Sequence, residues 1–240
     1  MKVLDLFSGI GGFSLGLERA GMETVAFCEI DPFCQKVLRK HWPDVPIFDD
    51  VTKLRGADIG PVDVICGGFP CQDLSIAGKQ EGIDAERSGL WSEIVRLAGE
   101  LRPSFVIVEN VANLLAGPSG QPGRWFGRIL GDLAAFRFDA EWHCIPASAL
   151  GAPHNRDRVW IVAYPVGGQR RQEPLFRSIG RMGGEQQPFP WDGGWEAALA
   201  RVRGMDDGLS GRVVRTDAIR NAVVPQIPEM LGRAIMEASA

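Results

Sequence analysis

The sequence predicts an α/β protein with a doubly wound, mostly parallel β-sheet and a small irregular second domain. Two observations favour the sheet: short apolar runs alternate with helical patterns up to about residue 164, and this βαβ rhythm places helices on both faces of a sheet. The second domain is indicated by residues 165–216, which hold ten glycines, four prolines and two tryptophans with little periodicity. We therefore expect a main domain at 1–164, a small domain at 165–216 and a C-terminal segment at 217–240 that returns to the main domain.

The N-terminal part of the main domain alternates strand and helix patterns. Apolar, β-prone runs predict strands at Lys2–Leu6, Thr24–Cys28 and Val62–Cys66, with a short third strand just before Asp50. A glycine turn precedes a predicted helix at Phe13–Arg19. A second helix is expected to open at Asp31-Pro32, because a capping residue there precedes a proline at the first helical position.

The remaining elements follow from the same patterns. Helices are expected at Ser88–Leu101, Trp125–Ala135 and Ile227–Glu237, the last with Pro228 near its start, and strands at Phe105–Val108 and Val159–Ala163. Within the irregular region, Trp195–Arg203 is the one segment with a short helical pattern.

Composition narrows the class of protein. The chain of 240 residues is 45% hydrophobic and 23% charged, as in globular proteins, and no apolar run reaches the ~18–20 residues of a membrane span. The N-terminal run MKVLDLFSGIGG has no small-residue cleavage site, so we expect a cytoplasmic protein without a signal peptide. None of the five cysteines forms a C-x-x-C pair, which argues against a disulfide framework and a metal site.

Charge is unevenly distributed along the chain. The net charge of −4 counts against a nucleic-acid partner. Residues 165–216, however, carry eight Arg, no Lys and six acidic residues, so this segment is +2 and the rest of the chain is −6. A basic accessory segment on an acidic body can bind phosphates, and a solvated arginine-rich loop region is the alternative.

A first candidate site is the run DLFSGIGG, which lies between a strand and a helix. Glycines there permit a tight turn and let a ligand approach the backbone. Glu29 follows Gly9 by twenty positions, at the end of the next strand, where a carboxylate can accept hydrogen bonds from ribose hydroxyls. Asp50, after the third strand, is a candidate for an adenine amino group. These positions favour an adenosine-containing ligand over a plain tight turn.

A second candidate is Cys71, which follows the strand ending at Cys66 and the sequence GGFP. Ligands bind outside the carboxyl ends of strands in such sheets, and the glycines and proline shape the backbone before the thiol. The polar run Gln72–Ser88, with Gly78 and Gly82, has the composition of a mobile lid. The alternative is a small buried cysteine.

Two further motifs end or begin strands near the same edge. Glu109 begins the sequence ENV at the end of a strand, and its alternative role is a charge at a helix N-terminus. Arg156 and Arg158 lie two positions apart before the strand Val159–Ala163, so they share a face in extended chain. A surface pair with Asp157 is the alternative.

Taken together, the motifs resemble those of the cytosine-C5 DNA methyltransferases, which depend on S-adenosylmethionine. The matching motifs, in the family's order, are DLFSGIGG (5–12), Glu29, Asp50, GFPCQ (68–72) with Ser75, ENV (109–111), NRDR (155–158) and NAVVP (221–225). The resemblance implies a class I methyltransferase fold of Rossmann-like type, with the cofactor-binding catalytic domain at 1–164 and the target-recognition domain at 165–216.

The resemblance also implies a role for each matching residue. The S-adenosylmethionine site would be formed by Phe7, Gly9, Ile10, Gly12, Glu29, Ile30, Asp50, Leu90 and Asn221. Cys71 would be the nucleophile, Glu109 would contact cytosine N3 and the exocyclic amine, and Arg158, supported by Arg156, would contact O2. Expected DNA contacts are Gln72, Ser75, Arg170, Arg171, Arg177 and Arg181, with Trp191 and Trp195 as further candidates. No metal is expected, and the partner would be double-stranded DNA bound by a monomer.

The chain departs from the family pattern at two places. The region between the arginine motif and the C-terminal motif is short, which leaves the target sequence open. Arg220 precedes Asn221 where the family has glycine, and a bulky residue adopts a positive φ less readily. An RNA substrate, a free nucleotide or another one-carbon group, and a non-catalytic binding module remain as alternatives.

Overall fold

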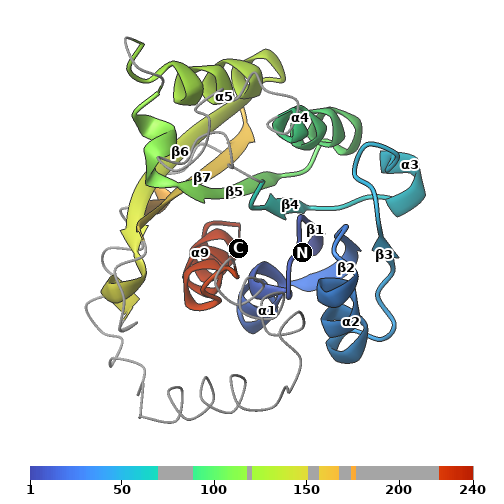
Figure 1. Ribbon diagram of the computed structural model, residues 1–240. Coiled ribbons are helices and arrows are strands. Elements are labelled where there is room, and N and C mark those ends of the chain that lie inside the picture. Colours follow the sequence, from blue (N-terminus) through green and yellow to red (C-terminus); the bar gives the residue numbers. More distant parts are fainter. Residues whose placement is uncertain (70–88, 118–120, 151–156, 168–173, 177–221, 240) are drawn as a thin grey trace, which may run out of the picture.

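The computed structural model describes residues 1–69, 89–117, 121–150, 157–167, 174–176 and 222–239. Its strands form one seven-stranded sheet in the order β3-β2-β1-β4-β5-β7-β6 (Figure 1). The predicted α/β class, with a doubly wound and mostly parallel sheet, is confirmed. The predicted helix at Trp195–Arg203, the lid and most of the 165–216 segment lie outside the described residues.

The parallel half of the sheet contains the strands expected from the N-terminal part of the sequence. Its members are β1 (Lys2–Leu6), β2 (Glu23–Cys28), β3 (Ile47–Phe48), β4 (Val64–Gly67) and β5 (Phe105–Val111). β1 lies between β2 and β4, pairing Leu6 with Cys28 on one side and with Gly67 on the other. The carboxyl ends of these strands consequently lie along one edge of the sheet.

The antiparallel half is less visible in the sequence. β7 (Asp157–Pro165) pairs antiparallel with both β5 and β6 (Phe138–Pro146). β6 was not predicted, because it is an edge strand whose run FDAEWHCIP is mostly exposed or half-buried and lacks an apolar stretch. β7 extends two residues beyond the predicted strand at each end, which brings Arg158 into the sheet.

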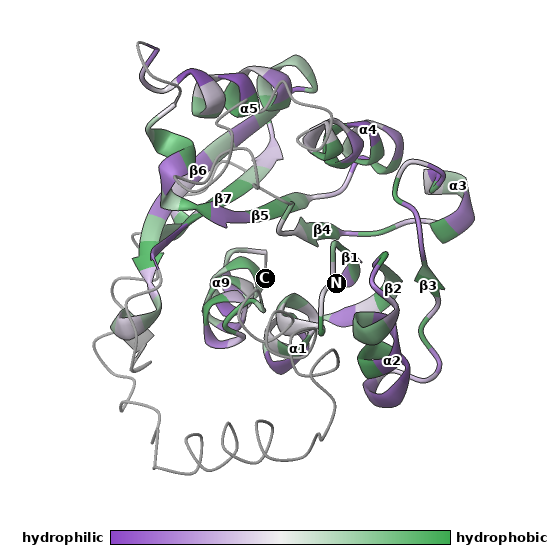
Figure 2. Ribbon diagram, viewed as in Figure 1, coloured by the Kyte–Doolittle hydropathy of each residue, from purple (hydrophilic) through white to green (hydrophobic). Residues whose placement is uncertain are grey.

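Helices cover both faces of the sheet, as Figure 1 shows. On one face, α4 (Leu90–Leu101) and α5 (Arg124–Ala135) bury apolar side chains against one set of strand residues, including Leu4, Leu6 and Ile65. On the other face, α1 (Gly12–Arg19) and α9 (Gln226–Ala238) pack against the alternate residues Val3 and Val64. In Figure 2 the central strands β4 and β5 are largely green, as expected for strands covered on both faces, whereas the edge strand β6 is mixed in colour.

The smaller elements connect these layers. α2 (Pro32–His41) begins as predicted, because the Asp31 carboxylate accepts hydrogen bonds from the Phe33 and Cys34 amides at 2.8 and 2.9 Å. Short helical turns not predicted from the sequence are α3 (Gly56–Ile59), η2 (Ala112–Leu115) and η3 (Ala147–Leu150). Within the described ranges, no helix is both long and apolar enough to cross a membrane.

The first and last helices pack directly against each other. A Cβ added to Gly16 would lie 2.2 Å from the Pro225 carbonyl oxygen, and one added to Gly12 would lie 2.5 Å from the Val223 carbonyl oxygen. The two glycines therefore allow the backbone before α9 to contact α1. Arg19 and Glu229 add an ion pair at 3.7 Å across the same interface. Residues 222–238 are thus an integral part of the fold built by residues 1–165.

Candidate functional site

The carboxyl ends of the parallel strands gather most of the described candidate residues. The glycine turn follows β1, Glu29 and Ile30 follow β2, Asp50 follows β3, and Gly68 follows β4. Glu109 lies near the end of β5. Ligands of open α/β sheets bind at this edge, so the structure brings both predicted centres to the place where one substrate and one cofactor can meet.

The glycine turn has an unusual backbone conformation. Gly9 and Gly11 have φ angles of 54° and 87°, in the region that glycine adopts without strain. Phe7 also has a positive φ, of 53°, although it is a bulky residue. Such a conformation costs about 1–3 kcal/mol and persists where the surroundings impose it, often at a ligand site.

Two side chains hold this turn in place. The Glu29 carboxylate accepts the Gly9 amide at 2.7 Å through one oxygen and the Asp31 amide at 2.8 Å through the other. The Ser8 hydroxyl donates to the Asp5 carbonyl oxygen at 2.7 Å. Glu29 therefore shapes the turn, and because each carboxylate oxygen accepts more than one hydrogen bond, it keeps capacity for ribose hydroxyls.

Asp5, near the end of β1, stabilises the segment around the glycine turn. Its side chain is fully buried, and one oxygen accepts the Ser14 hydroxyl at 2.7 Å and the Ser14 amide at 3.3 Å. The other oxygen has no hydrogen-bond partner. Burial, offset in part by Ser14, raises the pKa of Asp5 from 3.8 to about 7. This residue was not among the predicted site residues, although a carboxylate inside an apolar strand was a visible signal.

The space around the turn fits the nucleoside of S-adenosylmethionine. A Cβ added to Gly9 would meet no atom within 4 Å, so the turn is open on that side. The Ile30 side chain is 77% exposed, which is unusual for isoleucine and leaves an apolar surface beside Glu29. Hydrogen bonds from Thr52 and Lys53 lower the pKa of Asp50 to about 2, so it is an ionised acceptor for an amino group. This donor and acceptor set fits ribose and adenine.

The other predicted cofactor residues have different surroundings. Gly12 is buried and faces Val223, so its lack of a side chain is needed for packing of the C-terminal segment. Leu90 opens α4 and packs partly buried against the apolar core. Ile10 is half-buried within the turn. Asn221 lies outside the described residues, immediately before Ala222.

The second centre contains an ion pair between two of the predicted catalytic residues. Arg158 Nε lies 2.9 Å from Glu109 Oε1, and both side chains are mostly shielded from water. The two residues come from adjacent strands, since Val111 on β5 is the register partner of Arg158 on β7. Arg158 also donates to the backbone carbonyl of Asp157 at 2.9 Å, so it makes no pair with the Asp157 carboxylate in this contact. Glu109 lies in a strand and not at a helix N-terminus.

The chain that leads to Cys71 is fixed beside this pair. The buried Asn110 side chain donates to the Phe69 carbonyl oxygen at 3.2 Å. A Cβ added to Gly68 would lie 3.0 Å from Glu109 Oε2, so a side chain there would crowd this carboxylate and force it to shift. Cys71 follows Phe69 by two positions and lies outside the described residues. Asn110 belongs to the ENV motif but was not predicted as a site residue.

The four cysteines that the structure describes are poor candidates for the nucleophile. Cys28, Cys34 and Cys66 are buried, and burial raises the pKa of the first two thiols to about 12 and that of Cys66 well above its ordinary value. Cys144 is exposed, and desolvation and Asp157 raise its pKa too. A thiolate is the reactive form, so a raised pKa makes each of these thiols less reactive at neutral pH than an ordinary cysteine.

The remaining predicted site residues cannot be placed. They lie outside the described ranges: Cys71, Gln72, Ser75, Arg156, Arg170, Arg171, Arg177, Arg181 and Asn221. Among the residues that are described, no cluster of three or more His, Cys, Asp or Glu side chains could hold a metal ion.

Comparison with known proteins agrees with this arrangement. The C-5 cytosine-specific DNA methylase family matches residues 1–179. The chain belongs to this family. A type II methyltransferase of Bacillus subtilis, M2.BsuMI, is 39% identical over 167 residues, which are 68% of this chain and 42% of that protein. M1.ScrFI of Lactococcus lactis, also a type II methyltransferase, is 38% identical over 68% of this chain and 41% of its own length.

The fold of this family member is shared with a solved structure. A prophage-encoded protein of Escherichia coli, assigned as a DNA modification methyltransferase, superposes with a TM-score of 0.58 at 30% identity, covering 69% of this chain and 47% of that one. The alignments with curated relatives leave more than half of those relatives unmatched. The family match therefore covers residues 1–179, and the chain spans less than half the length of these two curated relatives.

Proposed function

We propose that this protein transfers a methyl group from S-adenosylmethionine to carbon 5 of cytosine in DNA. The observation that carries the proposal is the Glu109–Arg158 pair, 2.9 Å apart at the strand edge, beside the Gly68–Phe69 backbone that leads to Cys71. A carboxylic acid and a guanidinium at this point, with a thiol two residues after Phe69 in the sequence, match what the cytosine ring requires, since these groups can act on N3, O2 and carbon 6. Membership of the family supports the same reaction.

The cofactor would be held along the ends of β1 to β3. The glycine turn would receive the methionine part, Glu29 the ribose and Asp50 the adenine amino group, while the exposed Ile30 would cover the adenine ring. Leu90 and Asn221 would complete the pocket. S-adenosylmethionine supplies an electrophilic methyl group on its sulfonium sulfur.

Cys71 makes the cytosine reactive. Its thiolate adds to carbon 6 and forms a C–S bond, which turns the ring into an enamine whose carbon 5 is nucleophilic. Carbon 5 would then accept the methyl group from the sulfonium sulfur, and the donor would leave as the thioether S-adenosylhomocysteine. A base removes the proton from carbon 5, the C–S bond breaks, and the thiolate is regenerated.

Glu109 and Arg158 stabilise the charge that the thiolate brings to the ring. When the base arrives, Glu109 takes up a proton from solvent and donates a hydrogen bond to N3, while Arg158 donates to O2. Before that, the contact with Arg158 at 2.9 Å holds the Glu109 carboxylate in position. Gly68 leaves space beside Glu109 for the ring, and Asn110 anchors the backbone two residues before Cys71. Arg156, on the same strand entry as Arg158, is assigned a supporting role.

The substrate would be double-stranded DNA, bound by a monomer. Carbon 6 is inaccessible in a duplex, so the base must leave the stack at a cost of a few kcal/mol. Gln72 and Ser75 follow Cys71 and would contact the flipped nucleotide. Phosphate contacts are assigned to the basic 165–216 segment, which carries Arg170, Arg171, Arg177 and Arg181.

The covalent step is tested with duplex DNA that contains 5-fluorocytosine. Fluorine blocks the removal of the group on carbon 5, so after methyl transfer the adduct cannot be eliminated and should survive denaturing electrophoresis. We expect an adduct with the wild-type protein only when S-adenosylmethionine is present. Cys71→Ser should form no adduct and methylate at least 1000-fold more slowly, a loss of ~4 kcal/mol or more in transition-state stabilisation, while it still binds S-adenosylhomocysteine.

Two controls test whether the adduct depends on Cys71 and whether the substrate is DNA. Cys144→Ser changes the exposed described cysteine and should leave adduct formation intact. Structured RNA with 5-fluorocytosine, offered in parallel, tests the alternative substrate. Normal turnover by Cys71→Ser would exclude the covalent mechanism, and an adduct on RNA alone would exclude DNA as the substrate.

A further inference from the structure

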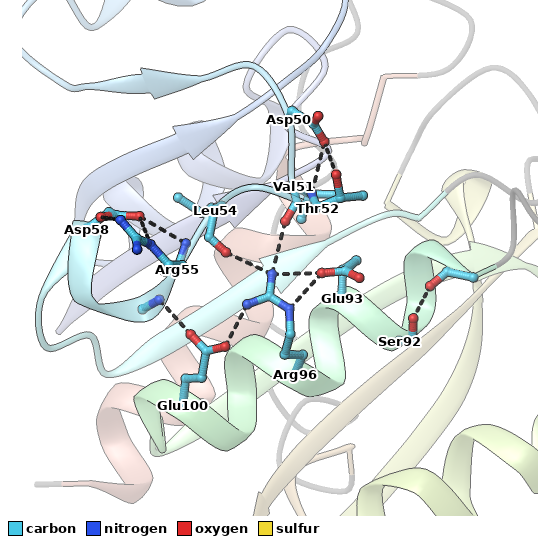
Figure 3. Close-up of polar contacts among 12 residues, drawn as sticks. Asp50, Val51, Thr52, Leu54, Arg55, Asp58, Ser92, Glu93, Arg96 and Glu100 are labelled. Atoms are coloured by element: carbon cyan, nitrogen blue, oxygen red, sulfur yellow. Dashed lines mark hydrogen bonds and ion pairs between the residues drawn. The ribbon is translucent and has the colours of Figure 1, made fainter.

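A cluster of polar contacts connects helix α4 to the turn that carries Asp50 (Figure 3). Its centre is Arg96, in the middle of α4, whose side chain is two-thirds shielded from water. The Arg96 guanidinium donates to the Val51 carbonyl oxygen at 3.0 Å and to the Leu54 carbonyl oxygen at 2.8 Å. A single side chain thus binds two backbone groups of the irregular turn that follows β3.

Two carboxylates of the same helix complete the cluster. Glu93 accepts from Arg96 Nε at 2.7 Å, and Glu100 accepts from a terminal nitrogen at 2.6 Å. The second oxygen of Glu100 accepts the Gly56 amide at 2.7 Å. We call Glu93, Arg96 and Glu100 the α4 clasp. The clasp binds three backbone groups between residues 51 and 56, and its spacing along one face of α4 matches the i, i+3 and i+4 neighbours of a helix.

The turn held by the clasp presents a predicted cofactor residue. Asp50 accepts hydrogen bonds from the Thr52 amide at 3.0 Å and the Thr52 hydroxyl at 2.6 Å, and its carbonyl oxygen accepts the Lys53 and Leu54 amides. Its carboxylate is therefore oriented by the turn, and the turn by Arg96. Leu90, a second predicted cofactor residue, opens the helix that carries the clasp, and Ser92 closes the first turn of that helix onto the Gly89 carbonyl oxygen.

From these contacts we propose that Arg96 is a positioning residue for recognition of the adenine base: through the Val51 and Leu54 carbonyl groups it sets the place of Asp50 relative to Leu90. This inference rests on the proposed use of S-adenosylmethionine and adds to it the residue that governs base selectivity. Arginine suits the task because its planar fork binds several acceptors in fixed directions, whereas lysine offers a single ammonium group.

The test compares Arg96→Lys with a matched arginine change in the same region. Arg55 pairs with Asp58 at 3.2 Å, and its side chain is 75% exposed, so Arg55→Lys is the control. Affinity is measured by calorimetry for S-adenosylhomocysteine and for S-inosylhomocysteine. In the second ligand a carbonyl group replaces the amino group that would donate a hydrogen bond to Asp50. No DNA is present, so methyl transfer does not enter the measurement.

The expected result is a loss of selectivity as well as of affinity. Wild-type protein and Arg55→Lys should prefer the adenosyl ligand by about tenfold or more, which corresponds to the ~1.4 kcal/mol of one oriented hydrogen bond. In Arg96→Lys the adenosyl affinity should fall about tenfold and the inosyl affinity much less, so the preference approaches one. In an Asp50→Asn background, Arg96→Lys should cause no further loss of selectivity.

Several outcomes would overturn the proposal. Unchanged selectivity in Arg96→Lys would assign Arg96 to stability alone, and so would an equal loss of both affinities. Wild-type protein that binds both ligands equally would remove Asp50 from base recognition, and the clasp with it, while leaving the methyl-transfer proposal standing. Wild-type protein that binds neither ligand would refute the proposed function itself. Should Arg96→Lys fold poorly in thermal melts, Glu100→Gln, which keeps both carbonyl contacts of Arg96, should show a smaller shift in the same direction.

Discussion

Asp5 is a single residue whose environment determines both its charge and its use. It is buried beneath the glycine turn, with Ser14 on one oxygen and no partner on the other. Two titratable groups face it, Glu29 and the Cys66 thiol, and neither supplies a positive charge. Burial therefore dominates, and the pKa rises from 3.8 to about 7. The carboxyl group is mainly protonated just below neutral pH in the folded protein and ionised in the unfolded chain.

This difference predicts a pH-dependent stability that Asp5→Asn should remove. Between about pH 4 and pH 7 the folded state keeps a proton that the unfolded state has lost, so the free energy of unfolding falls as the pH rises. With a pKa near 7 in the folded state, the loss by pH 7 relative to Asp5→Asn should be roughly 2–4 kcal/mol. Urea unfolding of both proteins across this range measures it.

A matched control uses an exposed acid at the start of β2, Glu23. Glu23→Gln should keep the wild-type pH dependence. Parallel curves for wild type and Asp5→Asn would mean that Asp5 is ionised in the folded protein and that its buried charge is compensated.

Among the elements, those with a strong local signal were predicted correctly, and those created by tertiary contacts were not. β1 was predicted with its observed bounds, and α2 with its Asp31 cap, because an apolar run and a capping residue are local properties. β6 has no apolar run and exists because it pairs with β7. At the site, the motifs identified Glu109 and Arg158, but the α4 clasp escaped, since its contacts join α4 to residues more than forty positions earlier in the chain.

Replacing a helix glycine by alanine should change the free energy of unfolding in opposite directions at Gly16, which lies in the α1–α9 interface, and at Gly131, which does not. In Gly16→Ala the new methyl group would meet the Pro225 carbonyl oxygen at 2.2 Å and the Glu229 amide at 2.8 Å, both backbone atoms that cannot move cheaply. We expect a loss of roughly 1–3 kcal/mol in the free energy of unfolding, as for other overpacked sites. Gly131→Ala on α5 meets no atom within 4 Å and should gain about 0.5–1 kcal/mol from helix propensity.

Denaturant titration of the two variants decides the point. Equal and small effects at both positions would mean that residues 222–238 do not pack on α1 as described, and S-adenosylhomocysteine affinity should then be unaffected by Gly16→Ala as well.

For the whole molecule, the uneven charge has a consequence for DNA binding. The chain has a net charge of −4, whereas residues 165–216 have a net charge of +2. The proposed DNA contacts therefore lie in a basic segment attached to an acidic domain. Association should therefore weaken with salt, with a slope set by the number of phosphates that this segment contacts.

Replacing Arg170 and Arg171 together with Gln tests this assignment. Each phosphate contact contributes about 0.9 to the slope of log K against log salt concentration, so the double variant should reduce the slope by about 2 and leave S-adenosylhomocysteine affinity unchanged. Arg39→Gln with Lys40→Gln, at the exposed end of α2, removes the same charge elsewhere and should change the slope much less. Equal slopes for the two double variants would assign the effect to net charge and not to contacts by the arginines.

The contact between Gly12 and Val223 joins residues about 200 positions apart. At ~5–20 residues per second, a ribosome needs roughly 10–40 s to make the chain between them. Through that interval the apolar face of α1 has no α9 to cover it, and Gly12 has no Val223 backbone packed against it. The exposed α1 face of a nascent chain would therefore be a binding site for chaperones until residues 222–238 are made and fold back.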